Sequence, residues 1–170
     1  MSGLLRNLLT IFKALFRYRS TGADSCIASH FLISPLDTGI ATLKSDKYFQ
    51  LAEACQLDFL IRTGLITTML RDGISFVNAS QLVKFMKPIR LFNRVRVDTA
   101  IVFADGKHAY FSHVFFSGEQ QRGEVMVKMK FKKGAITVPP HQLLGDPVQE
   151  KPAHLQRWDD ALEAIGNPGR

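Results

Sequence analysis

Residues 48–65 of the chain read YFQLAEACQLDFLIRTGL, a stretch whose apolar side chains recur at helical spacing. The residues that repeat every three or four positions are Tyr48, Leu51, Ala52, Cys55, Phe59 and Leu60. Phe49, Leu57 and Ile61 add apolar groups on other sides, and Gly64 is a helix-ending signal. A helix that is apolar around most of its circumference is enclosed by its domain, so the pattern predicts a buried helix.

Strand patterns lie on both sides of this helix. A short run over 26–34 stops at Pro35, and four longer runs follow the helix, at 76–85, 94–103, 107–116 and 124–131. Asp105-Gly106 predicts a tight hairpin, whereas Ser117-Gly118 indicates a longer connection. An antiparallel sheet that follows one enclosed helix predicts an α+β domain.

The last strand run alternates between an apolar face and a mostly basic one. Its apolar face contains Val125, Val127, Met129 and Phe131, and its other face contains Met126, Lys128, Lys130 and Lys132. This alternation is typical of a half-buried strand, and it predicts that the lysines point into solvent.

The size and charge of the chain limit what it can be. A chain of 170 residues is long enough for one sizeable core, and the net charge of +7 favours anionic partners. Cys26 and Cys55 lack CxxC spacing, and the five histidines show no ligand spacing, so neither a disulfide framework nor a metal site is expected. Nucleic-acid binding would rest on charge alone, and we do not expect it.

Two flanking segments differ from the strand-rich middle. Residues 1–20 predict a basic amphipathic helix in which Arg6 and Lys13 interrupt the apolar run, so it does not cross a membrane. Within it, residues 4–19 either contact a membrane peripherally or pack on the domain or on a dimer partner. Residues 146–170 form a polar tail with a weak helix around 155–165.

Several motifs carry a resemblance to a known family. The stretch 34–49 reads SPLDTGIATLKSDKYF, residues 57–65 read LDFLIRTGL, residues 87–90 read KPIR, and residues 138–140 read VPP. Together they resemble the hotdog-fold acyl-CoA thioesterase superfamily, in its 4-hydroxybenzoyl-CoA thioesterase-like branch. The similarity is closest to bacterial proteins resembling thioesterase superfamily member 6.

The resemblance implies an architecture and a set of partners. Residues 24–145 would form a hotdog domain, in which a curved antiparallel sheet wraps around the central helix. The substrate would be an acyl-CoA or another acyl thioester, with CoA as part of the substrate and no separate cofactor. The protein would be a cytoplasmic homodimer or dimer of dimers, with sites at the subunit interface.

The resemblance also points to candidate site residues. Asp37 matches the loop carboxylate that attacks the thioester or activates water in similar enzymes, although Asp in a loop also commonly binds backbone N–H groups. Ser45 and Tyr48 are candidates to hydrogen-bond the substrate near the helix start, where unpaired N–H groups would stabilise an oxyanion. Capping is the alternative role for Ser45 and Asp46. Glu53 is a second candidate acid, or a solvated residue beside Gln50 and Gln56.

Two functional hypotheses follow. The first is an acyl-CoA thioesterase-like hydrolase that uses Asp37. The second is a non-catalytic hotdog protein that binds acyl chains or a protein partner, because Thr42-Leu43-Lys44-Ser45 stands where His-Met-Asn-Asn is expected. By residue type alone, the candidate cations for the CoA phosphates are Lys87, Arg90, Arg94, Lys132 and Lys133.

Overall fold

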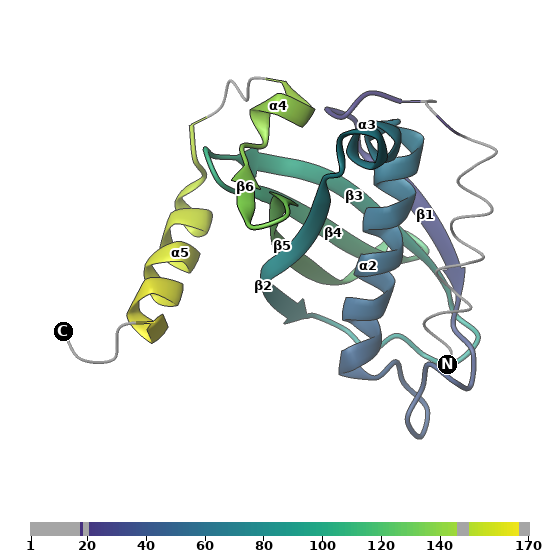
Figure 1. The fold of residues 1–170 in the computed structure, drawn as a ribbon. Helices are drawn as coiled ribbons and strands as arrows, with labels where there is room; N and C mark the ends of the chain where they lie inside the picture. Colours follow the sequence, from purple (N-terminus) through teal and green to yellow (C-terminus); the bar gives the residue numbers. More distant parts are fainter. Residues whose placement is uncertain (1–17, 19–20, 146–149, 167–170) are drawn as a thin grey trace.

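The computed structural model describes residues 18, 21–145 and 150–166, and it contains one curved antiparallel sheet. Five strands run in the order β1-β3-β4-β5-β2, and a short sixth strand, β6, pairs with β5. Their bounds are β1 Ile27–Leu32, β2 Ser75–Phe85, β3 Arg94–Ala104, β4 Ala109–Ser117, β5 Gln120–Lys133 and β6 Ile136–Val138. Figure 1 shows the sheet curving around one long helix, as expected for an α+β hotdog domain.

The long helix is α2, Ser45–Arg62, and it ends where the sequence predicts. Gly64 adopts a left-handed φ of 76°, which a side chain would disfavour, and the shorter helix α3, Leu65–Asp72, follows at once. Side chains buried on α2 pack with the inward-facing residues of β3, β4 and β5 in one apolar core. The remaining helices are α4, His141–Leu144, and α5, Ala153–Gly166.

A polar contact fixes α2 to the edge strand β1. Ser29 Oγ donates a 2.6 Å hydrogen bond to Asp58 Oδ2, and Arg62 Nη1 lies 3.6 Å from the same oxygen. Arg62 Nη1 also donates to the backbone carbonyl of Ala28 at 3.2 Å. Asp58 and Arg62 are one helical turn apart, so the LDFLIR motif places both on the face that meets β1.

Of the two predicted hairpin connections, the one at Ser117-Gly118 differs from the sequence prediction. Ser117 pairs with Gln120, so only two residues connect β4 to β5, and Gly118 adopts a φ of 59°. Glycine at the first central position permits such a two-residue turn, and the expected longer connection at Ser117-Gly118 is therefore wrong. The tight hairpin predicted at Asp105-Gly106 is confirmed, since the Asp105 N–H donates to the His108 carbonyl at 2.8 Å and only Gly106 and Lys107 lie between them.

The outer face of the sheet is partly covered by α5. Figure 1 shows the sheet lying between α2 and α5, and Tyr110 and Met126 on the outer face form a second apolar cluster with Leu155 and Trp158 of α5. Lys128 is therefore not solvated as predicted, since its Nζ donates a 2.7 Å hydrogen bond to Asp159 Oδ1. Strand alternation alone does not reveal that a distant helix covers part of the polar face.

Asp159 is the polar anchor of α5. Its carboxylate accepts hydrogen bonds from Tyr110 Oη at 2.6 Å, from Lys128 at 2.7 Å and from Lys151. Burial raises the pKa of this carboxyl, but the hydrogen bonds from Lys128, Lys151 and Tyr110 outweigh it and lower the pKa to about 2.

Asp159→Asn is expected to lower the free energy of unfolding by about 2 kcal/mol near neutral pH. Because the folded pKa lies below the ordinary value, the stabilisation is complete above about pH 4 and is lost as the pH falls toward about 2. Urea unfolding across that range should show the difference between the two proteins shrinking in acid. Asp160→Asn, on the exposed neighbour, is the control, and an equal loss in both variants would contradict the anchor.

Most of the predicted leader, residues 1–20, lies outside the described residues, and its helix and membrane contact stay predictions. Among the described residues, no helix is both long and apolar enough to cross a membrane. Helix α5 includes the segment for which the sequence indicates a weak helix.

Candidate functional site

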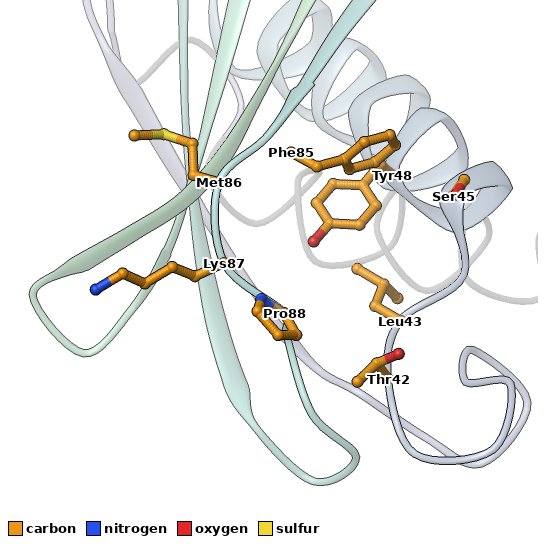
Figure 2. Close-up of a pocket in the computed structure, with 8 residues that line it drawn as sticks. All are labelled: Thr42, Leu43, Ser45, Tyr48, Phe85, Met86, Lys87 and Pro88. Carbon is orange, nitrogen blue, oxygen red and sulfur yellow. The ribbon is translucent and has the colours of Figure 1, made fainter.

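A cavity of about 290 Å³ lies where α2 begins and β2 ends. Its lining residues come from the loop before α2, from the first turn of α2, and from the end of β2 with the segment that follows it. They are Thr42, Leu43, Ser45, Tyr48, Phe85, Met86, Lys87 and Pro88. Figure 2 shows the ring of Tyr48 beside Phe85 and above Leu43, Thr42 and Pro88, whereas the side chains of Met86 and Lys87 extend away from Tyr48 in this view.

The ring of Tyr48 lies in a slot that the sheet provides. Phe85, Gly123 and Phe115 are aligned across β2, β5 and β4, and the missing side chain of Gly123 leaves room between the two phenylalanines. The Tyr48 ring centroid is 5.1 Å from that of Phe85 and 5.0 Å from that of Phe115. A Cβ on Gly123 would lie 3.4 Å from Tyr48 Cε1 and 2.8 Å from the Lys84 carbonyl oxygen. This packing holds Tyr48 in one orientation.

The hydroxyl of Tyr48 points into the cavity. The side chain is only 3% exposed, yet none of the described residues forms a hydrogen bond with the hydroxyl. Figure 2 shows this oxygen directed away from α2 toward the space beside Pro88 and Leu43. Burial raises the pKa of Tyr48, with partial compensation from Arg122, so the phenol keeps its proton at neutral pH. The site therefore contains a positioned donor that lacks an acceptor.

The first turn of α2 faces the same cavity. The N-cap is Lys44, no side chain caps the helix, and Ser45 lines the cavity. The capping role predicted for Ser45 is therefore wrong, since the residue lies one position inside the helix. Asp46 does place an acid in the first turn. An uncapped helix start presents backbone N–H groups and partial positive charge, which suits a carbonyl oxygen that gains negative charge.

Two cations lie beside the opening. Lys87 lines the cavity, and the backbone N–H groups of Met86 and Lys87 both donate to the Arg122 carbonyl at 3.0 Å. Arg122 Nη1 donates to the Pro88 carbonyl at 3.4 Å, which keeps the guanidinium near the cavity. Of the cations that the sequence offers for CoA phosphates, Lys87 is at the cavity. Lys132 lies elsewhere, since its Nζ donates hydrogen bonds to the Ala135 carbonyl and to Thr137 Oγ1 near β6.

Asp37 is buried in the loop before α2, and it is not among the cavity-lining residues. Its Oδ2 accepts hydrogen bonds from Ser34 Oγ at 2.6 Å and from the Ser34 N–H at 3.0 Å. Its backbone carbonyl accepts a 3.1 Å hydrogen bond from the Lys44 N–H, directly before α2. The structure thus places Asp37 beside the start of α2 and shows the loop-stabilising contacts that aspartate commonly makes.

Glu53 is exposed on α2, and the cavity lining does not include it. The expected polar strip is wrong at Gln56, which is fully buried. Gln56 and Asn78 of β2 exchange two side-chain hydrogen bonds of 3.3 Å, beside the register shift between Asn78 and Ser80. This pair joins α2 to the edge strand, because a buried amide requires a partner.

The sequence predicts only part of this site. Ser45, Tyr48 and Lys87 were candidates, but Phe85, Met86 and Arg122 were not. The glycine at 123, in a strand otherwise rich in large side chains, was the signal that another group approaches the sheet closely there.

Solved structures share the architecture. The probable thioesterase YbaW of Escherichia coli matches with a TM-score of 0.66 at 13% identity, over 72% of this chain and 99% of its own. A probable thioesterase of Bartonella henselae gives 0.60 at 18% identity, over 75% and 100%. The DHNA-CoA thioesterase of Staphylococcus aureus gives 0.61 at 13% identity, over 85% and 95%.

No family model matches the sequence, and no curated protein does. Identities this low establish the fold and not the activity. The chain therefore has the hotdog fold, as the sequence motifs predict, and many solved structures with this fold are named thioesterases.

Proposed function

We propose that this hotdog-fold chain binds an acyl thioester in the cavity at the start of α2 and hydrolyses it to a free acid and CoA. The observation that supports this most directly is the Tyr48 hydroxyl, which belongs to a buried side chain, points into the cavity and has no acceptor among the described residues. A thioester carbonyl oxygen supplies the missing acceptor, and the first-turn N–H groups of α2 add to its stabilisation.

The proposed reaction needs few groups. Water adds to the thioester carbonyl carbon, the carbonyl oxygen becomes an oxyanion, and Tyr48 with the α2 N-terminus stabilises that charge. The C–S bond then breaks, the acid leaves, and the CoA sulfur takes up a proton. Asp37 is the proposed base for the water, and Lys87 and Arg122 are suited to the CoA phosphates. Ser45 is a further proposed substrate contact, and no separate cofactor takes part.

A second candidate function is acyl-thioester binding without hydrolysis. The observation that favours it is that no carboxylate lines the cavity, while Asp37 accepts two hydrogen bonds from Ser34. In this case the cavity would hold the carbonyl and would not activate water.

Purified full-length protein, assayed on acyl-CoAs of short, medium and long chain, separates the two. Release of free CoA thiol on any of them, above the rate of spontaneous hydrolysis, supports the hydrolase. Saturable binding of the same compounds by calorimetry, without release of thiol, supports the binding protein. Neither release nor binding across the panel would refute both.

We also propose that two copies pair along β2. Among the described strands, β2 pairs only with β5, so its other edge is open, and four large apolar residues on or beside it are about half exposed. They are Val77, Leu82, Phe85 and Met86. An open edge with apolar side chains is suited to strand pairing, and a partner there would complete the cavity beside Phe85.

Val77→Lys combined with Leu82→Lys is expected to convert the dimer into a monomer, since charges on an edge strand oppose pairing. Both residues lie outside the cavity lining. Light scattering after size exclusion gives the mass. Ile136→Lys, at an exposed apolar residue away from β2, should leave the dimer intact, and a monomeric parent chain would contradict the proposed pairing.

A cytoplasmic location is part of the proposal. Cys26 is exposed, Cys55 is buried, and the two do not form a disulfide, which suits a reducing compartment.

A further inference from the structure

The end of the molecule at which α2 begins carries large apolar side chains in solvent. Ile40 is 105% exposed, Leu36 71%, Phe92 66% and Leu32 62%. We name these four residues, together with the exposed cations around them, the loop-tip patch. Single exposed apolar residues need no explanation, but four on adjacent segments mark a contact surface.

Backbone hydrogen bonds hold the segments of the loop-tip patch side by side. The Phe92 N–H donates to the Ile33 carbonyl at 2.9 Å, and the Ile33 N–H donates to the Asn93 carbonyl at 3.0 Å. The Leu91 N–H donates to the Ala41 carbonyl at 3.1 Å, next to Ile40. The loops before α2 and before β3 therefore form one ordered surface.

Phe92 is held in an unfavourable conformation at this surface. Its φ is 61°, in the left-handed region that a bulky side chain disfavours, and it is the one non-glycine residue with positive φ in the described part of the chain. The turn is closed by the Arg90 N–H, which donates to Asn93 Oδ1 at 2.9 Å. Neither the backbone conformation nor the exposure of the ring stabilises the isolated fold, so both point to a binding partner.

The charge around these tips is positive. Lys44, Lys87, Arg90 and Arg94 are exposed, and none forms an ion pair with the described residues. The one acid within the two loops, Asp37, is buried, and the exposed acids at this end of the sheet are Asp46 in the first turn of α2 and Glu119 in the turn between β4 and β5. Basic residues around exposed apolar side chains match the chemistry of an anionic bilayer surface.

We propose that the loop-tip patch inserts into the interface of an anionic lipid bilayer. Four exposed apolar side chains ringed by cations suit an anionic lipid surface better than the close-packed surface of a protein partner. Leu32, at the end of β1, lies on the edge of the sheet opposite β2, so the proposed pairing along β2 leaves it uncovered. Thr42, Leu43 and Pro88 belong to the same loops and line the cavity, so docking would place the cavity at the membrane surface.

Co-sedimentation of the full-length chain with vesicles tests this without any substrate, so its outcome is independent of the proposed hydrolysis. Ile40→Ser combined with Phe92→Gly should lower partition into phosphatidylserine-containing vesicles at least tenfold. Leu70→Ser combined with Ile165→Ser removes exposed apolar groups from α3 and α5, and it should leave partition into these vesicles unchanged. Arg90→Gln and Arg94→Gln should each weaken binding about fivefold, and only when phosphatidylserine is present.

Residues 4–19 are the other segment for which the sequence predicts membrane contact, with packing on the domain or a dimer partner as the alternative, so each variant is also measured in a chain carrying Leu8→Asn and Ile11→Asn. The proposal is overturned if that chain no longer binds anionic vesicles, or if Ile40→Ser with Phe92→Gly leaves its binding unchanged. It is also overturned if the patch variants alter the oligomeric mass, which would assign the patch to a second copy. Phe92→Gly should raise the urea midpoint while weakening binding, a combination that a purely structural Phe92 would not give.

Discussion

Replacing Tyr48 by phenylalanine is expected to lower kcat/KM for acyl-CoA hydrolysis about hundredfold, because one donor to the developing oxyanion is removed. The ring remains, and its contacts with Phe85 and Phe115 are apolar, so the fold should be unaffected. The hydroxyl has no partner among the described residues, so no hydrogen bond within the described fold is lost. Initial rates over a range of substrate concentrations, beside thermal unfolding, measure both effects.

Tyr110 provides the matched control on the other side of the sheet. Its hydroxyl donates to Asp159 at 2.6 Å, and burial together with that carboxylate raises the pKa of Tyr110. Tyr110→Phe should therefore destabilise the fold by about 1–2 kcal/mol and leave kcat/KM unchanged. Tyr48→Phe should instead lower kcat/KM and leave the stability of the fold unchanged. A Tyr48→Phe protein with parental kcat/KM would remove this hydroxyl from the reaction.

Most of the fold could be predicted from the sequence, because local sequence patterns agree with the global packing over most of the domain. The apolar helix over 48–65, the strand runs and Gly64 each have a local cause, and each appears in the structure within a few residues. The errors at Lys128 and Gln56 occur where contacts connect distant segments, whereas those at Ser117-Gly118 and Ser45 concern the local details of a turn and a helix start. Lys128 is covered by α5, and Gln56 meets Asn78 across the fold, and neither contact leaves a periodic signal.

The candidate site could be predicted only in part from the sequence, for a related reason. Ser45 and Tyr48 follow each other closely on one helix, so their shared location could be predicted from spacing. Phe85, Met86 and Arg122 reach the cavity only because β2 and β5 pair in one register. Sheet register depends on the whole domain, and a single sequence does not specify it.

The role of Asp37 depends on separating its two possible functions. The carboxylate stabilises the loop through Ser34, and the backbone of the same residue contacts Lys44 at the start of α2. Asp37→Ala would be expected to impair the protein whether Asp37 is structural or catalytic, since truncation leaves the Ser34 donors unpaired. Asparagine keeps an acceptor oxygen at the same place, but it cannot take a proton from water. It therefore distinguishes the two roles.

Asp37→Asn is expected to lower kcat about a thousandfold while shifting the unfolding midpoint little, if Asp37 is the base of the proposed hydrolysis. Ser34→Ala is the complementary change: it removes the 2.6 Å hydrogen bond to Oδ2, and it should cost about 1–2 kcal/mol of stability while most of kcat remains. Rates at saturating acyl-CoA, with urea unfolding of both variants, give the comparison. Parental kcat in Asp37→Asn would assign the carboxylate to the loop alone, and the base would then have to come from elsewhere, such as the second copy across β2.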